Sequence, residues 1–209
     1  MTSPYTIPNL LTGLRIALIP VIIGLFYLPY HWSNMACGLL FAAVGITDAF
    51  DGYVARKLGQ TSPLGAFLDP VADKLIVATA LVLIVSKDPR WFVTLTAAVI
   101  IGREIAISAL REWMAQIGAQ AKLQVTGVAK FKTIVQIVGL SMMLFQEDLL
   151  GLPIYWLGLV LTIGAAVLTL WSMVTYLAAA GPELRGIVKL DTPGAAPTMT
   201  PPDRRRPRE

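Results

Sequence analysis

Six apolar stretches, each about as long as a membrane-crossing helix, constrain this chain more than any other feature of its sequence. A helix needs about 20 mostly apolar residues to cross a bilayer. Residues that break helices, chiefly Pro, Gly and Asp, separate the stretches. We therefore predict an all-α integral membrane protein with six transmembrane helices, at residues 8–29, 32–56, 64–86, 91–113, 126–145 and 152–180.

The composition agrees with a membrane protein and excludes two other classes. Of the 209 residues, 56% are hydrophobic and only 14% are charged, whereas soluble domains average about 25% charged residues. Disordered chains are poor in apolar residues, so this class is excluded as well. The single cysteine, Cys37, excludes an intrachain disulfide and a cysteine-cluster zinc site. We expect membrane phospholipids around the chain and no nucleic-acid partner.

The sequence predicts one membrane domain and one tail. Residues 1–180 hold the six spans, whereas residues 181–209 are rich in Pro and Arg and show no clear helical period. We expect this tail to be disordered. It would be either a solvated basic segment or a weak contact for anionic lipid headgroups.

The distribution of Lys and Arg predicts the orientation of the spans. The only Lys or Arg residues in the connections after the first, third and fifth spans are Lys87 and Arg90. Trp32, Trp91 and Trp156 lie near these connections. All other basic residues lie toward the opposite side, which the positive-inside rule places in the cytoplasm. Both termini are then cytoplasmic, and the far side is expected to be nearly featureless.

In four of the spans, the part without charged residues is too short to cross the membrane by itself. Spans two and three carry acids at their cytoplasmic ends, and spans four and five carry bases there. Ionisable residues at membrane depth are costly and are functional candidates by default. Carboxylates suit hard divalent cations, and basic side chains suit phosphate. We therefore predict a polar cavity in the cytoplasmic half of the bundle that handles phosphate with the help of a metal.

Two pairs of aspartates are the strongest candidates for chemistry. Asp48 and Asp51 are three residues apart, and Asp69 and Asp73 are four apart, so each pair lies on one face of a helix. Four carboxylates so close cannot all stay ionised without cations. Two Mg²⁺ or Mn²⁺ ions would neutralise them and hold a diphosphate. The alternative is a set of surface acids near the membrane.

Small and donor residues lie between the two aspartate pairs. Gly52 and Ala55 leave no bulk on the stripe that carries the first pair, so a ligand can approach the helix there. Arg56 and Ser62 can donate hydrogen bonds to phosphate oxygens. The alternative for Gly52 and Ala55 is close packing between helices.

The whole segment resembles the motif of a known family. The pattern D-x-x-D-G-x-x-A-R, then eight residues, then G-x-x-x-D-x-x-x-D, is filled at every position from Asp48 to Asp73. It is similar to the motif of the CDP-alcohol phosphatidyltransferases, and the resemblance extends over about residues 5–180. Residues 7–15 and 103–113 look like those of bacterial members that use sn-glycerol 3-phosphate as acceptor.

The resemblance implies an activity and a set of roles. The expected reaction transfers the phosphatidyl group from CDP-diacylglycerol to sn-glycerol 3-phosphate and releases CMP. The family further implies a homodimer in the bacterial inner membrane, with two divalent metals at a cytoplasmic site. Asp73 would be both a metal ligand and the general base. The residues along the CDP-diacylglycerol headgroup would be Asn9, Gly52, Ala55, Arg56, Ser62 and Gly65.

An acceptor that carries a phosphate needs cations. Arg103, Arg111 and Lys130 are the candidates, because the two arginines are eight residues apart and are expected to face roughly the same way on span four, and Lys130 opens span five. Anchoring at the headgroups is the alternative for each, as are ion pairs with Glu104 and Glu112 for the arginines. We expect such anchoring for Lys122 and Lys132. Arg15 suits either role.

Three other functions remain as alternatives. An intramembrane prenyltransferase also binds a diphosphate through aspartates and Mg²⁺, but it usually has more spans and another aspartate spacing. The same transferase chemistry with another alcohol, such as inositol phosphate or serine, is a second. The basic residues of spans four and five argue against serine, because serine carries no phosphate. A divalent-cation transporter is a third, and it would need charged sites reachable from both sides.

Overall fold

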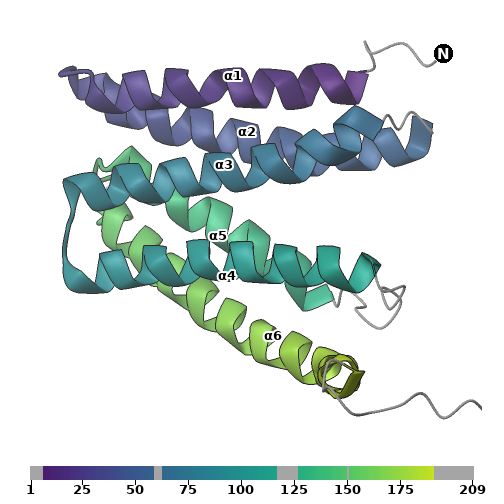
Figure 1. The fold of residues 1–209 in the computed structure, drawn as a ribbon. Coiled ribbons are helices and arrows are strands. Elements are labelled where there is room, and N and C mark those ends of the chain that lie inside the picture. Colours follow the sequence, from purple (N-terminus) through teal and green to yellow (C-terminus); the bar gives the residue numbers. More distant parts are fainter. Residues whose placement is uncertain (1–6, 59–62, 117–126, 150, 191–209) are drawn as a thin grey trace, which may run out of the picture.

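Six α-helices make up the described part of the chain (Figure 1). The computed structural model describes the backbone of residues 7–58, 63–116, 127–149 and 151–190, and the side chains of residues 10–47, 68–116, 132–149 and 151–174. Within these ranges the structure contains no sheet, only an isolated bridge between Leu149 and Leu152. The helices are α1 (Ile7–Tyr27), α2 (His31–Leu58), α3 (Pro63–Lys87), α4 (Trp91–Gln116), α5 (Gly127–Phe145) and α6 (Ile154–Leu190).

The predicted helices are confirmed, and most of their ends agree within three residues. Pro63 opens α3, and Pro89 and Pro153 precede α4 and α6, as expected of a residue that fits a first turn but not a helix interior. The predicted end of the last helix was wrong. Helix α6 continues to Leu190, ten residues past the predicted end. Apolar residues at 184, 187 and 188 keep a helical spacing there, so the predicted tail is helical over its first part.

Successive helices run in opposite directions, so alternate connections lie at the same end of the bundle (Figure 1). Helix α1 packs against α2 and α3, and α5 packs against α2 and α6, while α4 contacts α6 and α3. The N-terminal ends of α1, α3 and α5 and the C-terminal ends of α2, α4 and α6 therefore lie at one end of the bundle. We refer to it below as the polar end and to the other as the far end.

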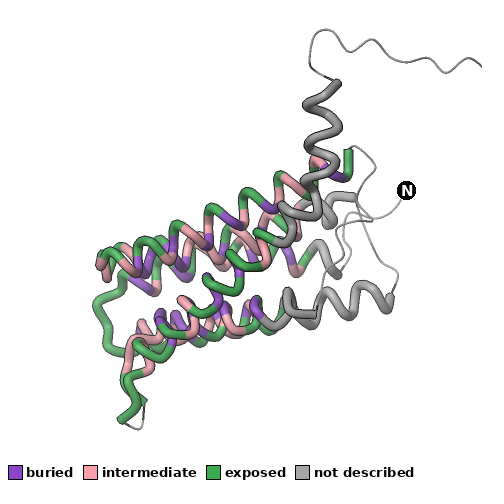
Figure 2. Tube along the Cα trace, turned by 90° about the horizontal axis from the view of Figure 1, so that it is seen from below, coloured by how far each residue is buried: buried purple, intermediate pink, exposed green. Residues whose placement is uncertain are grey.

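Three helices are long and apolar enough to cross a membrane, counted over the residues that the structure describes. They are α1 over Leu10–Tyr27, α4 over Trp91–Gln116 and α6 over Ile154–Val174, and α5 has a shorter apolar part, Lys132–Phe145. Large apolar side chains such as Leu10, Val160 and Trp171 are 67–75% exposed. Apolar surface so widely exposed fits a lipid environment. Buried residues recur between exposed ones along the described parts of the helices, as Figure 2 shows.

Two glycines bring α5 and α6 close together. A Cβ atom on Gly139 would lie 3.0 Å from the carbonyl oxygen of Gly158, and one on Gly158 would lie 2.7 Å from that of Gly139. Neither position has room for a side chain, so the two backbones touch at this crossing. Close approach at small residues is a common mode of packing between membrane helices.

Candidate active site

The four predicted metal-binding aspartates lie on the helices expected for them. Asp48 and Asp51 lie in the distal part of α2, and Asp69 and Asp73 lie near the start of α3. Both places are at the polar end (Figure 1). The helical spacing of each pair is therefore confirmed. The side chains of Asp48 and Asp51 lie outside the described residues, so the convergence of the four carboxylates stays a prediction.

The second aspartate pair is held by α1. The Thr12 hydroxyl donates a hydrogen bond to Oδ1 of Asp69, and the Arg15 guanidinium donates to Oδ1 of Asp73. Both donors are buried, at 2% and 6% exposure. The two predicted roles of Arg15 were an acceptor cation or a headgroup anchor, and the structure instead pairs it with a predicted metal ligand.

Sequence reasoning placed Thr12 in the stretch that carries the family resemblance but gave it no role, although a signal was present. Asn9, Thr12 and Arg15 follow one another at intervals of three on an otherwise apolar helix. Each is about 60° around the helix from the next, so the three form a slanted row along one side. A polar stripe on a membrane helix marks the face that turns away from lipid.

The middle of α4 contributes a buried arginine that contacts α6. Arg103 is 5% exposed, and its Nη1 donates to Oε1 of Glu104 over 2.7 Å. Its Nη2 donates to the Ser172 hydroxyl of α6 over 3.2 Å. Its Nε is buried and has no hydrogen-bond partner within the described part of the chain. The ion pair with Glu104, considered as an alternative, is therefore present, and it leaves part of the guanidinium unsatisfied.

Lys132 is buried rather than placed at the headgroups. It lies in the first turns of α5, is 5% exposed, and its Nζ has no hydrogen-bond partner among the residues whose side chains are described. The charges of Arg103, Glu104 and Arg111 act on it from α4. The predicted interfacial anchoring of Lys132 was wrong because α5 turns this side chain toward α4 instead of toward lipid. A buried ammonium without a partner is costly, and an anion bound here would remove that cost.

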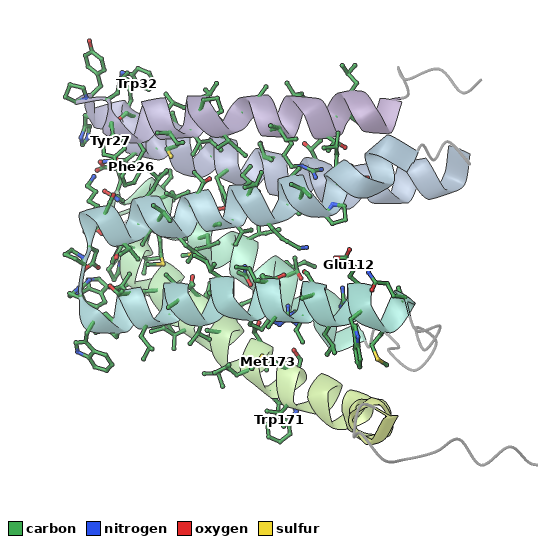
Figure 3. All side chains as sticks on the ribbon, viewed as in Figure 1. Phe26, Tyr27, Trp32, Glu112, Trp171 and Met173 are labelled. Carbon is green, nitrogen blue, oxygen red and sulfur yellow. The ribbon has the colours of Figure 1, made fainter. Side chains whose placement is uncertain are left out.

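The remaining predicted acceptor residues are less well placed. Arg111 is exposed on α4, whereas Arg103 is buried. Eight residues turn a helix by about 80° beyond two full turns, so the two arginines do not share one direction. Glu112 marks the distal part of α4 in Figure 3. Lys130 lies in α5, but its side chain is outside the described residues.

The predicted contacts for the lipid headgroup fall outside the described side chains. Five of these residues lie on the helix backbone of α1, α2 or α3, and one lies in the connection between α2 and α3 that the structure does not describe. Their roles stay predictions. They are Asn9, Gly52, Ala55, Arg56, Ser62 and Gly65.

Asp69 and Asp73 fit a site for a divalent cation. Mg²⁺ and Mn²⁺ take carboxylate oxygens, and an ionised carboxylate offers two oxygens with roughly four lone-pair positions. The Asp73 side chain is also 46% exposed, so Arg15 does not enclose it. Among the residues whose side chains are described, no three potential ligands gather, and a complete site requires the pair on α2.

The far end carries a polar cluster, where the sequence predicted a nearly featureless surface. Arg90 Nε donates to Asp88 Oδ1 over 2.6 Å, and its guanidinium lies 4.4 Å from the Trp156 ring centre. The Tyr155 hydroxyl also donates to Asp88. The hydrogen bond from Arg90 is the main reason why the pKa of Asp88 falls from 3.8 to about 2. These contacts join the α3–α4 connection to the start of α6.

Aromatic residues also mark the far end. Trp32, Trp91 and Trp156 are 50–75% exposed and start or nearly start α2, α4 and α6. Figure 3 shows Trp32 beside Phe26 and Tyr27 at this end. The predicted gathering of the three tryptophans at one end is confirmed, and they suit one membrane interface.

Comparison with known proteins decides the family. A family model described as CDP-alcohol phosphatidyltransferase matches residues 5–171. The chain belongs to the CDP-alcohol phosphatidyltransferase family. The matched region contains every residue that the sequence analysis assigned to a site. Family membership also sets aside the prenyltransferase and the cation transporter.

Named relatives within the CDP-alcohol phosphatidyltransferases narrow the comparison. Proteins of Escherichia coli K12, Salmonella choleraesuis and Shigella flexneri are each 47% identical to this chain over 180 residues. The alignments cover 86% of this chain and 97% of each relative. All three are named CDP-diacylglycerol–glycerol-3-phosphate 3-phosphatidyltransferase.

Proposed function

We propose that this protein transfers the phosphatidyl group from CDP-diacylglycerol to sn-glycerol 3-phosphate, forming phosphatidylglycerophosphate and CMP. The observation that carries the proposal is a complete family motif, from Asp48 to Asp73, in a chain 47% identical over nearly the whole length of relatives that bear this enzyme name. The buried cations Arg103 and Lys132 suit an acceptor that brings its own phosphate.

The proposed metal site takes both aspartate pairs. Asp48 and Asp51 of α2 with Asp69 and Asp73 of α3 would hold two Mg²⁺ or Mn²⁺ ions. When bound, such ions supply charge neutralisation at the diphosphate and at the departing CMP. The contacts from Thr12 and Arg15 to α3 support the proposal, since metal-ligating carboxylates are usually hydrogen-bonded to further protein groups.

The donor lipid is proposed to bind along the segment between the two aspartate pairs. Small residues at Gly52, Ala55 and Gly65 would let the nucleotide approach the helix backbone. Arg56 and Ser62 would donate to the diphosphate, and Asn9 of α1 would contact the nucleotide.

The acceptor is proposed to bind against the basic residues of α4 and α5. Arg103, Arg111 and Lys130 would bind its phosphate, and we add Lys132 to this set. Support comes from the buried Nζ of Lys132 and Nε of Arg103, which lack partners in the described structure. A phosphate dianion would satisfy both, and charge-assisted hydrogen bonds of this kind are about twice as strong as neutral ones.

The proposed reaction is a displacement at the phosphorus that carries diacylglycerol. Asp73 takes the proton from the 1-hydroxyl of sn-glycerol 3-phosphate as that oxygen attacks. The bond from phosphorus to the CMP oxygen breaks, and CMP leaves with the bonding electron pair. General-base assistance of this kind typically contributes about 10²–10⁴-fold in rate.

The proposed setting is the inner membrane of a bacterium. All six helices would cross the bilayer, with the polar end and both termini in the cytoplasm, and two copies would form a homodimer. Over their described residues, helices α2, α3 and α5 are not apolar over a full membrane span. Their charged ends would line the proposed polar cavity, which would open to the cytoplasm.

The decisive experiment offers purified protein one lipid and several alcohols. CDP-diacylglycerol with Mg²⁺ or Mn²⁺ is mixed with sn-glycerol 3-phosphate, glycerol, inositol phosphate or serine, and CMP release is measured. We expect CMP only with sn-glycerol 3-phosphate, and no release after chelation. Glycerol isolates the contribution of the acceptor phosphate, because it keeps the hydroxyls. Release with inositol phosphate or serine instead would replace the acceptor, and full activity after chelation would contradict the metal site.

A further inference from the structure

A buried threonine and a buried arginine of α1 both donate to the aspartates of α3. Thr12 and Arg15 are three residues apart, and their partners Asp69 and Asp73 are four apart. Helices α1 and α3 run in the same direction and pack side by side (Figure 1). Residues three or four apart lie one above the other on a helix, so one stripe of α1 meets one stripe of α3 in two successive turns.

Simple packing between helices does not account for these residues. An apolar pair would join α1 to α3 without the cost of removing a guanidinium from water, and such replacements are often neutral or stabilising. Threonine also has a local partner available in any helix, the carbonyl four residues earlier, as Thr96 shows with Phe92. The Thr12 hydroxyl donates across the helix interface to a carboxylate.

We propose that Thr12 and Arg15 are positioning residues that fix the side-chain orientation of Asp69 and Asp73 for metal binding. The inference rests on the proposed function, because it takes the two aspartates as ligands. Each donor engages Oδ1 of its aspartate and thereby sets the rotation of the carboxylate plane. Helix α1 then contributes to the metal site without supplying a ligand.

The expected effect is a loss of metal affinity. Removing a group that orients a metal ligand typically costs about 10–100-fold in affinity. Thr12→Val keeps the shape and loses the hydroxyl, whereas Thr12→Ser keeps the hydroxyl. Arg15→Lys keeps the charge and loses the planar guanidinium. Thr96→Val is the matched control, because its hydroxyl bonds only its own helix backbone in the described structure.

The test measures Mn²⁺ binding directly. Full-length protein in lipid nanodiscs is given CDP-diacylglycerol and no acceptor, and free Mn²⁺ is followed by electron paramagnetic resonance. We expect Thr12→Val to weaken Mn²⁺ binding by about tenfold or more, and Thr12→Ser and Thr96→Val to bind like the unmodified protein. Thermal midpoints in chelator report folding separately.

Two results would overturn the inference. The inference requires Thr12→Val to bind Mn²⁺ less tightly than the unmodified protein does, whatever the thermal midpoint of the variant. Equal binding refutes the inference. If Thr12→Val does not fold, Arg15→Lys decides in the same way, with a loss of at least about threefold expected and no loss refuting the idea. The proposed function fails separately if the unmodified protein and Asp73→Asn take up Mn²⁺ equally.

Discussion

Replacing Gly158 by alanine tests how closely α5 and α6 must approach. A Cβ atom at this position would lie 2.7 Å from the Gly139 carbonyl oxygen, 2.7 Å from the Met142 Cβ atom and 3.0 Å from the Met143 amide nitrogen. Two of these three atoms belong to the backbone. Relief therefore requires one helix to move, because rotating a side chain cannot open the space.

The magnitude follows from two opposing contributions. Overpacking a well-packed site costs about 1–3 kcal/mol, and contact with backbone atoms places Gly158→Ala near the upper value. Alanine returns about 0.8–1.0 kcal/mol through its higher helix propensity. The expected net loss is about 2 kcal/mol, which lowers the thermal midpoint of a chain of this length by about 4–8 °C.

Gly164 of the same helix supplies the control. A Cβ atom there would meet nothing within 4 Å, so Gly164→Ala is expected to gain up to about 1 kcal/mol from helix propensity. Both variants are heated in the same detergent, and unfolding is followed by tryptophan fluorescence. If Gly158→Ala melts at or above the temperature of Gly164→Ala, the close crossing of α5 and α6 is wrong.

Three further outcomes are expected. Lys132→Met should raise KM for sn-glycerol 3-phosphate by about tenfold or more with KM for CDP-diacylglycerol unchanged, and Lys132→Arg should retain most of the affinity; an equal effect on both substrates indicates a structural role. Asp73→Asn should abolish CMP release in a protein that circular dichroism shows to be folded, and near-normal turnover would remove Asp73 from the mechanism. Because the pKa of Asp88 is lowered from 3.8 to about 2, its stabilising contribution is complete above the higher value and is lost as the pH falls toward the lower one. Asp88→Asn should therefore melt below the unmodified protein at neutral pH, and the difference should close near pH 2; a constant difference would exclude the Asp88 charge as its source.

The helices could be predicted from the sequence because breakers and apolar runs mark them. Pro63, Pro89 and Pro153 fall next to helix starts, and the two aspartate pairs have helical spacing. The end of α6 could not be placed in this way, because Pro182 reads as a breaker although the helix continues past it. Membrane helices tolerate an internal proline where neighbouring groups satisfy the backbone groups that it leaves unpaired.

The partners of the site residues were harder to predict than the residues themselves. A threonine in an apolar helix has the same sequence whether it bonds its own backbone, as Thr96 does, or another helix, as Thr12 does. Lys130 and Lys132 are two residues apart, which is about 200° around a helix. The sequence alone therefore indicates that they face different ways, but only the packing of α5 shows that Lys132 is buried.

The polar cluster at the far end limits how the helices can separate. Asp88, Arg90 and Tyr155 tie the turn between α3 and α4 to the first turn of α6. Any separation of α3 from α4 would therefore increase with distance from this cluster and would be greatest at the polar end, where α3 starts and α4 ends.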